Sequence, residues 1–248
     1  MTQDDLDNAC HKGFLRVFHR LSLPLAARLE AFWSQQKDIR KPALLFTGHS
    51  AGGAIASLLY AHMETRTTDS HLTKLARRFS CLHCITFGSP PISLRPLSRR
   101  SGSSSLFISV LNQGDPVVKA DKAFLNNMLQ IPISTPALFH SADILGLDER
   151  LHQPSQVPPL DTPRDKGFIN HTGATIFRPP VRRLFVNSGT LLLIYEKKRH
   201  GVQRRPSELC VSIVKNEYLD RIPPGWRWTM HGMAVYKQRI HILASELG

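Results

Sequence analysis

The stretch "ALLFTGHSAGGAIASLLYAHM", residues 43–63, decides the fold of this chain. An apolar run leads directly into Gly-His-Ser-Ala-Gly at 48–52 and then into a segment of small and apolar residues. The first run shows no polar alternation, which is typical of a strand in a parallel sheet that is covered on both faces. Residues 51–66 predict a helix that packs closely on that strand. The sequence therefore predicts a strand, a tight turn and a helix.

Ser50 lies at the centre of this turn in a Gly-x-Ser-x-Gly pattern, between Gly48 and Gly52. A serine on so tight a turn takes a strained backbone, and its neighbours two positions away must lack bulk. The strain lifts the hydroxyl clear of the sheet. The N–H of Ala51, at the start of the helix, is then available to a developing oxyanion. Because the pattern also fits an ordinary glycine turn, a nucleophilic role depends on partners elsewhere in the chain.

A nucleophilic serine needs a histidine as its base and a carboxylate that orients the histidine. In α/β-hydrolases these groups follow in the order serine, acid, histidine. Asp115 is the best candidate for the acid because it ends the segment 104–115, which predicts a strand. The competing acids have no predicted strand in front of them: Asp121, Asp143 and Asp148.

His231 is the best candidate for the base because it lies on a loop directly before the last predicted helix. We expect the side chain of His49 to leave the turn in a direction different from that of Ser50. Other histidines follow the acid but lie in irregular or strongly basic stretches: His140, His152, His171 and His200.

The remaining segments predict an α/β fold with a mainly parallel sheet flanked by helices. We expect one domain over residues 1–248, with a Pro-rich irregular insertion at about 130–180. The expected elements are a helix at 14–37 interrupted at Pro24, strands at 81–88 and 104–115, two strands or a strand and a short helix at 190–199 and 208–216, and an amphipathic helix within 228–247.

The chain has 248 residues and an excess of basic side chains, 32 Lys and Arg against 19 Asp and Glu, for a formal net charge of +13. No signal peptide or membrane span is visible in the sequence. A basic cluster lies in the C-terminal half: Arg178, Arg182, Arg183, Lys197, Lys198, Arg199, Arg204 and Arg205. It lacks the interleaved aromatic or glycine pattern of a nucleic-acid module, so we expect solvated loops. An anionic membrane or lipid-droplet surface is the better candidate among functional partners.

The cysteine pair "CLHC" at 81–84 has the spacing of a zinc or redox pair. No second Cys or His pair lies at ligand spacing, and the pair falls within a predicted buried strand. We therefore expect structural cysteines and no metal site.

Five segments together resemble the class 3 lipases, an α/β-hydrolase family that includes the secreted fungal triacylglycerol lipases. They are "HKGF" at 11–14, "LLFTGHSAGGAIASLL" at 44–59, "ITFGSPPIS" at 85–93, "VLNQGDPVV" at 110–118 and "HGMAVY" at 231–236. The resemblance implies hydrolysis of lipid esters through an acyl-enzyme without a cofactor. It also implies that Ser50 is the nucleophile, Asp115 the orienting acid and His231 the general base.

One departure from the family concerns the second oxyanion donor, which in these lipases comes from a strand and loop well before the His-x-Gly-Phe segment. Only ten residues precede His11, so we expect the sheet to lack N-terminal strands. Two alternatives to an active lipase follow. One is a truncated or catalytically impaired lipase-like protein, and the other is a basic nucleic-acid-binding protein.

Overall fold

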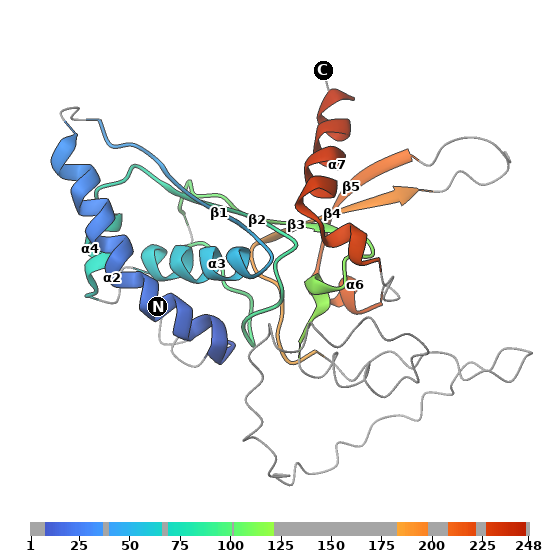
Figure 1. Cartoon of the computed structure of the whole chain (residues 1–248), viewed down its shortest axis with the longest axis horizontal. Helices are drawn as coiled ribbons and strands as arrows, with labels where there is room; N and C mark the ends of the chain where they lie inside the picture. Colours follow the sequence, from blue (N-terminus) through green and yellow to red (C-terminus); the bar gives the residue numbers. More distant parts are fainter. Residues whose placement is uncertain are drawn as a thin grey trace, which may run out of the picture.

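The computed structural model of the chain describes residues 8–36, 40–65, 69–100, 102–121, 183–197, 208–221 and 227–246. A five-stranded sheet with the strand order β1-β2-β3-β4-β5 forms its centre (Figure 1). The strands are β1 (Leu44–His49), β2 (Leu82–Phe87), β3 (Phe107–Asn112), β4 (Thr190–Lys197) and β5 (Glu208–Val214). The first four strands pair in parallel and β5 pairs antiparallel with β4. The predicted α/β fold with a mainly parallel sheet is confirmed.

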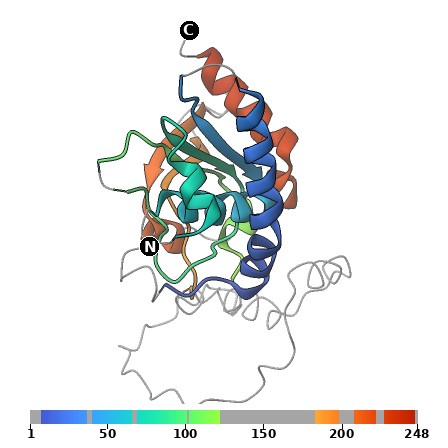
Figure 2. The same ribbon diagram turned by 90° about the vertical axis from the view of Figure 1, so that its left-hand side faces the viewer.

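Helices cover both faces of the sheet, as the two views of the ribbon show (Figure 1, Figure 2). On one face lie α2 (Lys12–Gln35), α3 (Ala51–Glu64) and α4 (His71–Ala76), with the 3-10 turn η1 (Val117–Lys119) and α6 (Asn216–Arg221) covering the same face further along. On the other face lies α7 (Met233–Ser245), which follows the 3-10 turn η5 (Trp228–His231). The two helical layers bury both faces of the central strands.

The register of the parallel strands places one row of side chains under α3. Phe46, Cys84 and Phe107 lie opposite one another on β1, β2 and β3, and all three are buried. Cys84 is therefore a core residue, and burial raises the pKa of its thiol to about 12. Cys81 is only half buried and, like Cys84, is a free thiol. The predicted structural role of this cysteine pair is confirmed for Cys84.

Strand β1 is not covered on both faces, so that prediction was wrong. Leu45 is 54% exposed, although its neighbour Phe46 is buried. The reason is the position of β1 at one end of the described sheet. Helices α2 and α3 pack on the face that carries Phe46, whereas α7 packs against β5, at the opposite end of the sheet.

Helix α2 continues through Pro24 instead of breaking there. A proline inside a helix removes one backbone hydrogen bond, and such helices persist when packing holds the flanking turns. Pro24 is exposed, while Phe18 and Ala26 are buried on either side of it in the helix. Tertiary contacts therefore outweigh the local cost of the proline.

Of the two alternatives for the segments 190–199 and 208–216, the structure has two strands, β4 and β5, within their described residues. The helix expected in 228–247 is α7, and the loop before it carries His231. The Pro-rich insertion at 130–180 lies outside the described residues, and the single domain over 1–248 stays a prediction. None of the helices in the described ranges is long and apolar enough to span a bilayer.

Candidate active site

The turn between β1 and α3 places Ser50 in a strained backbone conformation. Its φ of 56° and ψ of −129° make it the one non-glycine residue with positive φ in the described part of the chain. Such a conformation costs about 1–3 kcal/mol and persists only where the surroundings impose it. Here the N–H of Ser50 donates to the carbonyl of Phe87 at 3.0 Å, which fixes the turn to the carboxyl end of β2.

One position of this turn requires glycine and a second is crowded, but the crowded one is not the second glycine of the pattern. A Cβ on Gly48 would lie 2.4 Å from the carbonyl carbon and oxygen of Gly52, so no side chain fits there. A Cβ on Gly52 would meet nothing within 4 Å, so the expected steric need at Gly52 is wrong. The second crowded position is Gly53, where a Cβ would lie 3.0 Å from the Cβ of Ser89.

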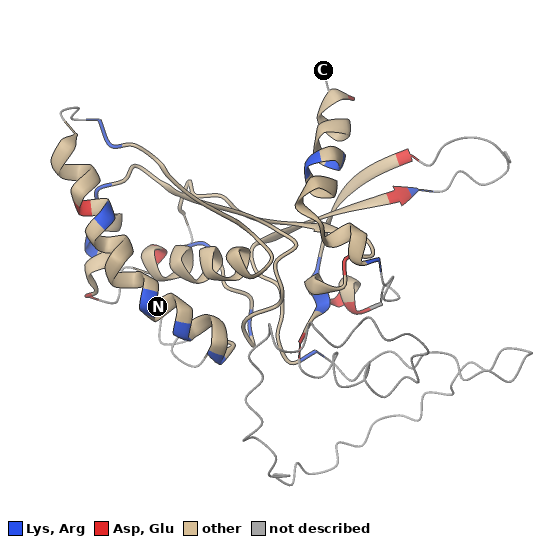
Figure 3. Cartoon of the chain, viewed as in Figure 1, with Lys and Arg blue, Asp and Glu red and all other residues tan. Residues whose placement is uncertain are grey.

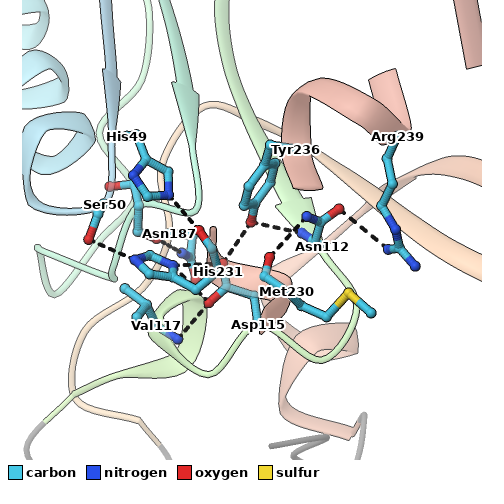
Figure 4. A network of polar contacts seen from close by, with 11 residues as sticks. His49, Ser50, Asn112, Asp115, Val117, Asn187, Met230, His231, Tyr236 and Arg239 are labelled. Carbon is cyan, nitrogen blue, oxygen red and sulfur yellow. Dashed lines mark hydrogen bonds and ion pairs between the residues drawn. The ribbon is translucent and has the colours of Figure 1, made fainter. Parts of the chain in front are cut away.

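The structure brings Ser50, His231 and Asp115 together in one hydrogen-bonded chain (Figure 4). Nε2 of His231 lies 2.9 Å from Oγ of Ser50. Nδ1 of the same ring lies 3.1 Å and 3.0 Å from the two carboxylate oxygens of Asp115. Nδ1–H donates to the carboxylate, which leaves Nε2 free to accept the serine proton. Residues far apart in the sequence thus meet at the carboxyl edge of the sheet.

The carboxylate of Asp115 is fully enclosed and is held by two further donors. The N–H of Val117 donates to one oxygen at 2.8 Å, and the hydroxyl of Tyr236 donates to the other at 2.8 Å. The Tyr236 hydroxyl also accepts from the N–H of Asn112 at 2.9 Å. Burial, followed by the negative charge of Asp115, raises the pKa of Tyr236 well above 10. Tyr236 therefore stays a neutral donor throughout the physiological range.

Two side chains hold the backbone around His231. Nε2 of His49 lies 2.6 Å from the carbonyl oxygen of His231, and the two imidazole rings are 4.6 Å apart. The amide nitrogen of Asn112 donates to the carbonyl of Met230 at 3.0 Å. The side chain of His49 was expected to leave the turn in a direction different from that of Ser50. It packs directly against the ring of His231. The sequence gave no signal for this contact, because His49 and His231 are 182 positions apart and meet only in the folded chain.

Sequence reasoning assigned no role to Asn112 and Tyr236, although both lie in the quoted motifs "VLNQGDPVV" and "HGMAVY". Their positions relative to Asp115 and His231 were the available signal. Among the competing acids, Asp121 is described and accepts from the N–H of Phe185, away from Ser50. The other competitors, Asp143, Asp148, His140, His152, His171 and His200, lie outside the described residues.

One member of the predicted basic cluster is not part of any solvated loop. Arg183 is buried, and its guanidinium pairs with Asp220 and donates to Asn187 at 2.9 Å. A buried cation requires such partners, because desolvation without them is costly. Of the other members, the structure describes Lys197 alone. Within the described ranges, no group of three His, Cys, Asp or Glu side chains is placed to hold a metal ion.

The sequence profile of the family "Lipase (class 3)" matches residues 1–124, half of the chain, which include the turn with Ser50 and the loop with Asp115. The chain belongs to the class 3 lipase family. Among solved structures, the native Rhizomucor miehei lipase propeptide complex is similar, with 23% identity and a TM-score of 0.34. That similarity covers 48% of this chain and 35% of the solved chain, so the chain spans about a third of that structure. No curated protein matches the chain.

The tight turn between β1 and α3 around Ser50, called the elbow below, should tolerate a methyl group at Gly52 but not at Gly48. We expect Gly48→Ala to lower the free energy of unfolding by at least about 1–3 kcal/mol, because the new Cβ overlaps the backbone of Gly52. Gly52→Ala should leave it unchanged or raise it by up to about 1 kcal/mol, since alanine favours the helix and the space is open. Urea unfolding followed by circular dichroism measures both. Equal losses in the two variants would contradict the described turn.

Removing the hydroxyl of Tyr236 should destabilise the acid end of the site. Tyr236→Phe leaves a buried carboxylate oxygen of Asp115 and the N–H of Asn112 each without this partner. We expect a loss of about 1–3 kcal/mol in the free energy of unfolding. The control is Tyr218→Phe, at an exposed tyrosine, which should stay within about 0.5 kcal/mol. If both variants unfold at the same urea concentration, Tyr236 does not hold Asp115.

Proposed function

We propose that the chain is a serine hydrolase that cleaves the carboxylic ester bonds of lipids, with Ser50, His231 and Asp115 as its catalytic triad. The observation that carries this proposal is the continuous hydrogen-bonded chain from Ser50 Oγ through His231 to Asp115. If His231 had only a structural role, its hydrogen bonds would not need to include Ser50, whose backbone is strained. Membership of the class 3 lipase family supports lipid esters as the substrate class.

In the first half of the reaction, Ser50 Oγ attacks the carbonyl carbon of the ester while His231 Nε2 takes the hydroxyl proton. A tetrahedral intermediate forms and the imidazole becomes a cation. The enclosed carboxylate of Asp115 stabilises that cation and keeps the ring in the required tautomer. The bond between the carbonyl carbon and the alcohol oxygen then breaks, and His231 returns the proton to the leaving alcohol.

In the second half, a water molecule attacks the acyl-serine ester while His231 again accepts the proton. The bond to Ser50 Oγ breaks, the carboxylic acid leaves, and the proton returns to the serine. The N–H of Ala51 is the proposed donor to the oxyanion in both halves. As the first amide of α3, it has no acceptor within the helix, and it lies at the positive end of the helix dipole.

The position of His49 predicts that its side chain holds the loop of His231 in place. The imidazole of His49 holds the His231 carbonyl and packs beside a ring that becomes positive during the reaction. We expect His49→Ala to lower kcat about fivefold, the equivalent of one hydrogen bond, with little change in KM. Steady-state hydrolysis of a p-nitrophenyl ester measures both constants. The opposite pattern, a raised KM with unchanged kcat, would place His49 in substrate binding.

The triad itself is tested with a fluorophosphonate probe, which reacts covalently with activated serines. We expect labelling of the purified chain, and none in Ser50→Ala or His231→Ala. Ester turnover in Asp115→Asn should fall by a factor on the order of 10⁴, because the ring loses its orienting acceptor. The matched control is His241→Ala, at an exposed histidine on α7, which should label like the original chain.

If the folded chain neither labels nor turns over any ester, the proposal fails and the catalytically impaired lipase-like alternative takes its place. Labelling that survives Ser50→Ala would likewise move the reactive group away from the elbow. Binding to nucleic acid that is independent of Ser50 and weakens steeply with salt would favour the other alternative.

A further inference from the structure

The outward side of α2 combines exposed apolar side chains with basic ones. Its inner side packs on the core through a row that includes Phe18 and Ala26. Four large apolar residues remain on the outside, where they are from 40% to 73% exposed: Val17, Leu21, Leu23 and Phe32. Four cations are also exposed on this helix: Lys12, Arg16, Arg20 and Arg28. Figure 3 shows basic positions on α2 from its N-terminal end onward, and none lies in its last turn.

These cations lack acidic partners within the part of the chain that the structure describes. Among the residues that the structure describes, none of the four forms an ion pair. Helix α2 contains a single acidic residue, Glu30, and its carboxylate is already engaged by Nε2 of His71 at 2.6 Å. A solvated helix side usually carries charges of both signs that pair with each other. Apart from Glu30, the charged side chains exposed on α2 are all basic, and they lie beside apolar groups.

We infer that the outward side of α2 docks on an anionic lipid surface. Basic side chains beside exposed apolar ones are the composition of helices that lie in a membrane interface, where the apolar groups enter the acyl boundary and the cations meet acidic headgroups. The long stems of Lys and Arg let their charges reach the headgroups while the stems stay in apolar contact. Charge complementarity selects an anionic surface over a neutral one.

The location of α2 fits this role because its first residue lies at the edge of the sheet that carries Ser50. The N–H of His11, directly before α2, donates to the carbonyl of Ile92 at 2.8 Å. Ile92 follows the carboxyl end of β2. The last residue of β2, Phe87, accepts a hydrogen bond from the N–H of Ser50. Docking along α2 would therefore hold the edge with the candidate site close to the lipid. The choice of lipid as partner rests on the proposed function, but the binding does not depend on turnover.

The test measures sedimentation of the full chain, carrying Ser50→Ala to exclude hydrolysis, with vesicles of phosphatidylcholine in which one third of the lipid is phosphatidylserine. We expect binding to these vesicles and much weaker binding to pure phosphatidylcholine. Arg16→Gln with Arg20→Gln should lower the partition coefficient about 25-fold, about fivefold for each cation. Raising the ionic strength from about 0.1 M to about 1 M shortens the screening length from about 10 Å to about 3 Å and should also release the protein.

The matched control removes two exposed cations at a distance from α2. Lys215 follows β5 and Lys237 lies on α7, on the opposite face of the sheet. Lys215→Gln with Lys237→Gln should bind like the original chain, whereas Val17→Ser with Leu21→Ser should bind more weakly without changing the net charge. Circular dichroism verifies that each variant is folded.

Several outcomes would overturn the inference. The full chain does not bind the anionic vesicles, or it binds neutral vesicles equally well, or the arginine variant binds as well as the lysine control. A concentration-dependent dimer that Val17→Ser with Leu21→Ser abolishes would assign the surface to a second copy. Fluorophosphonate labelling is measured separately on the chain with Ser50, so a failure of lipid docking and a failure of the proposed hydrolase remain distinguishable.

Discussion

The positive φ of Ser50 is the constraint on which the rest of the site depends. This backbone conformation is unfavourable, and the surrounding contacts maintain it. Gly48 lies close to the backbone of Gly52, and the N–H of Ser50 donates to the carbonyl of Phe87. The same turn joins the edge strand to its neighbour and aims the hydroxyl away from the sheet toward His231. The stability of the surrounding fold thus maintains a local strain of about 1–3 kcal/mol.

At Asp115, by contrast, the backbone is not strained at a positive φ, and both carboxylate oxygens accept hydrogen bonds. The Asp115 carboxylate lies at the end of β3 and accepts from His231, from Tyr236 and from the backbone of Val117. Buried charges are stable only with such partners, and a complete set also fixes their positions. One helix, α7, provides Tyr236, and the turn before it provides His231. The packing of α7 on the sheet therefore sets the distances from His231 to Ser50 and to Asp115.

The two faces of α2 have different physical roles. The inner side contributes to the largest core cluster, on the same face of the sheet as α3, the helix that follows Ser50. The outer side carries exposed apolar groups beside cations that form no ion pair within the described residues, and this composition suits a lipid surface of opposite charge. A helix that both braces the elbow and meets a lipid interface would couple the position of the site to its substrate.

The sequence by itself determined the strand, tight turn and helix around Ser50 and the α/β class, and it singled out Ser50, Asp115 and His231 as candidates. It could do so because these features are local, as a strand, a glycine turn and a helix follow directly from the order of residue types, and the acid and base each adjoin a predicted element. Only the tertiary structure decided that Leu45 is exposed, that Pro24 stays within a helix, that Gly53 and not Gly52 is crowded, and that His49 packs on His231. Each of these depends on which element lies opposite, and that is set by packing between segments far apart in the chain.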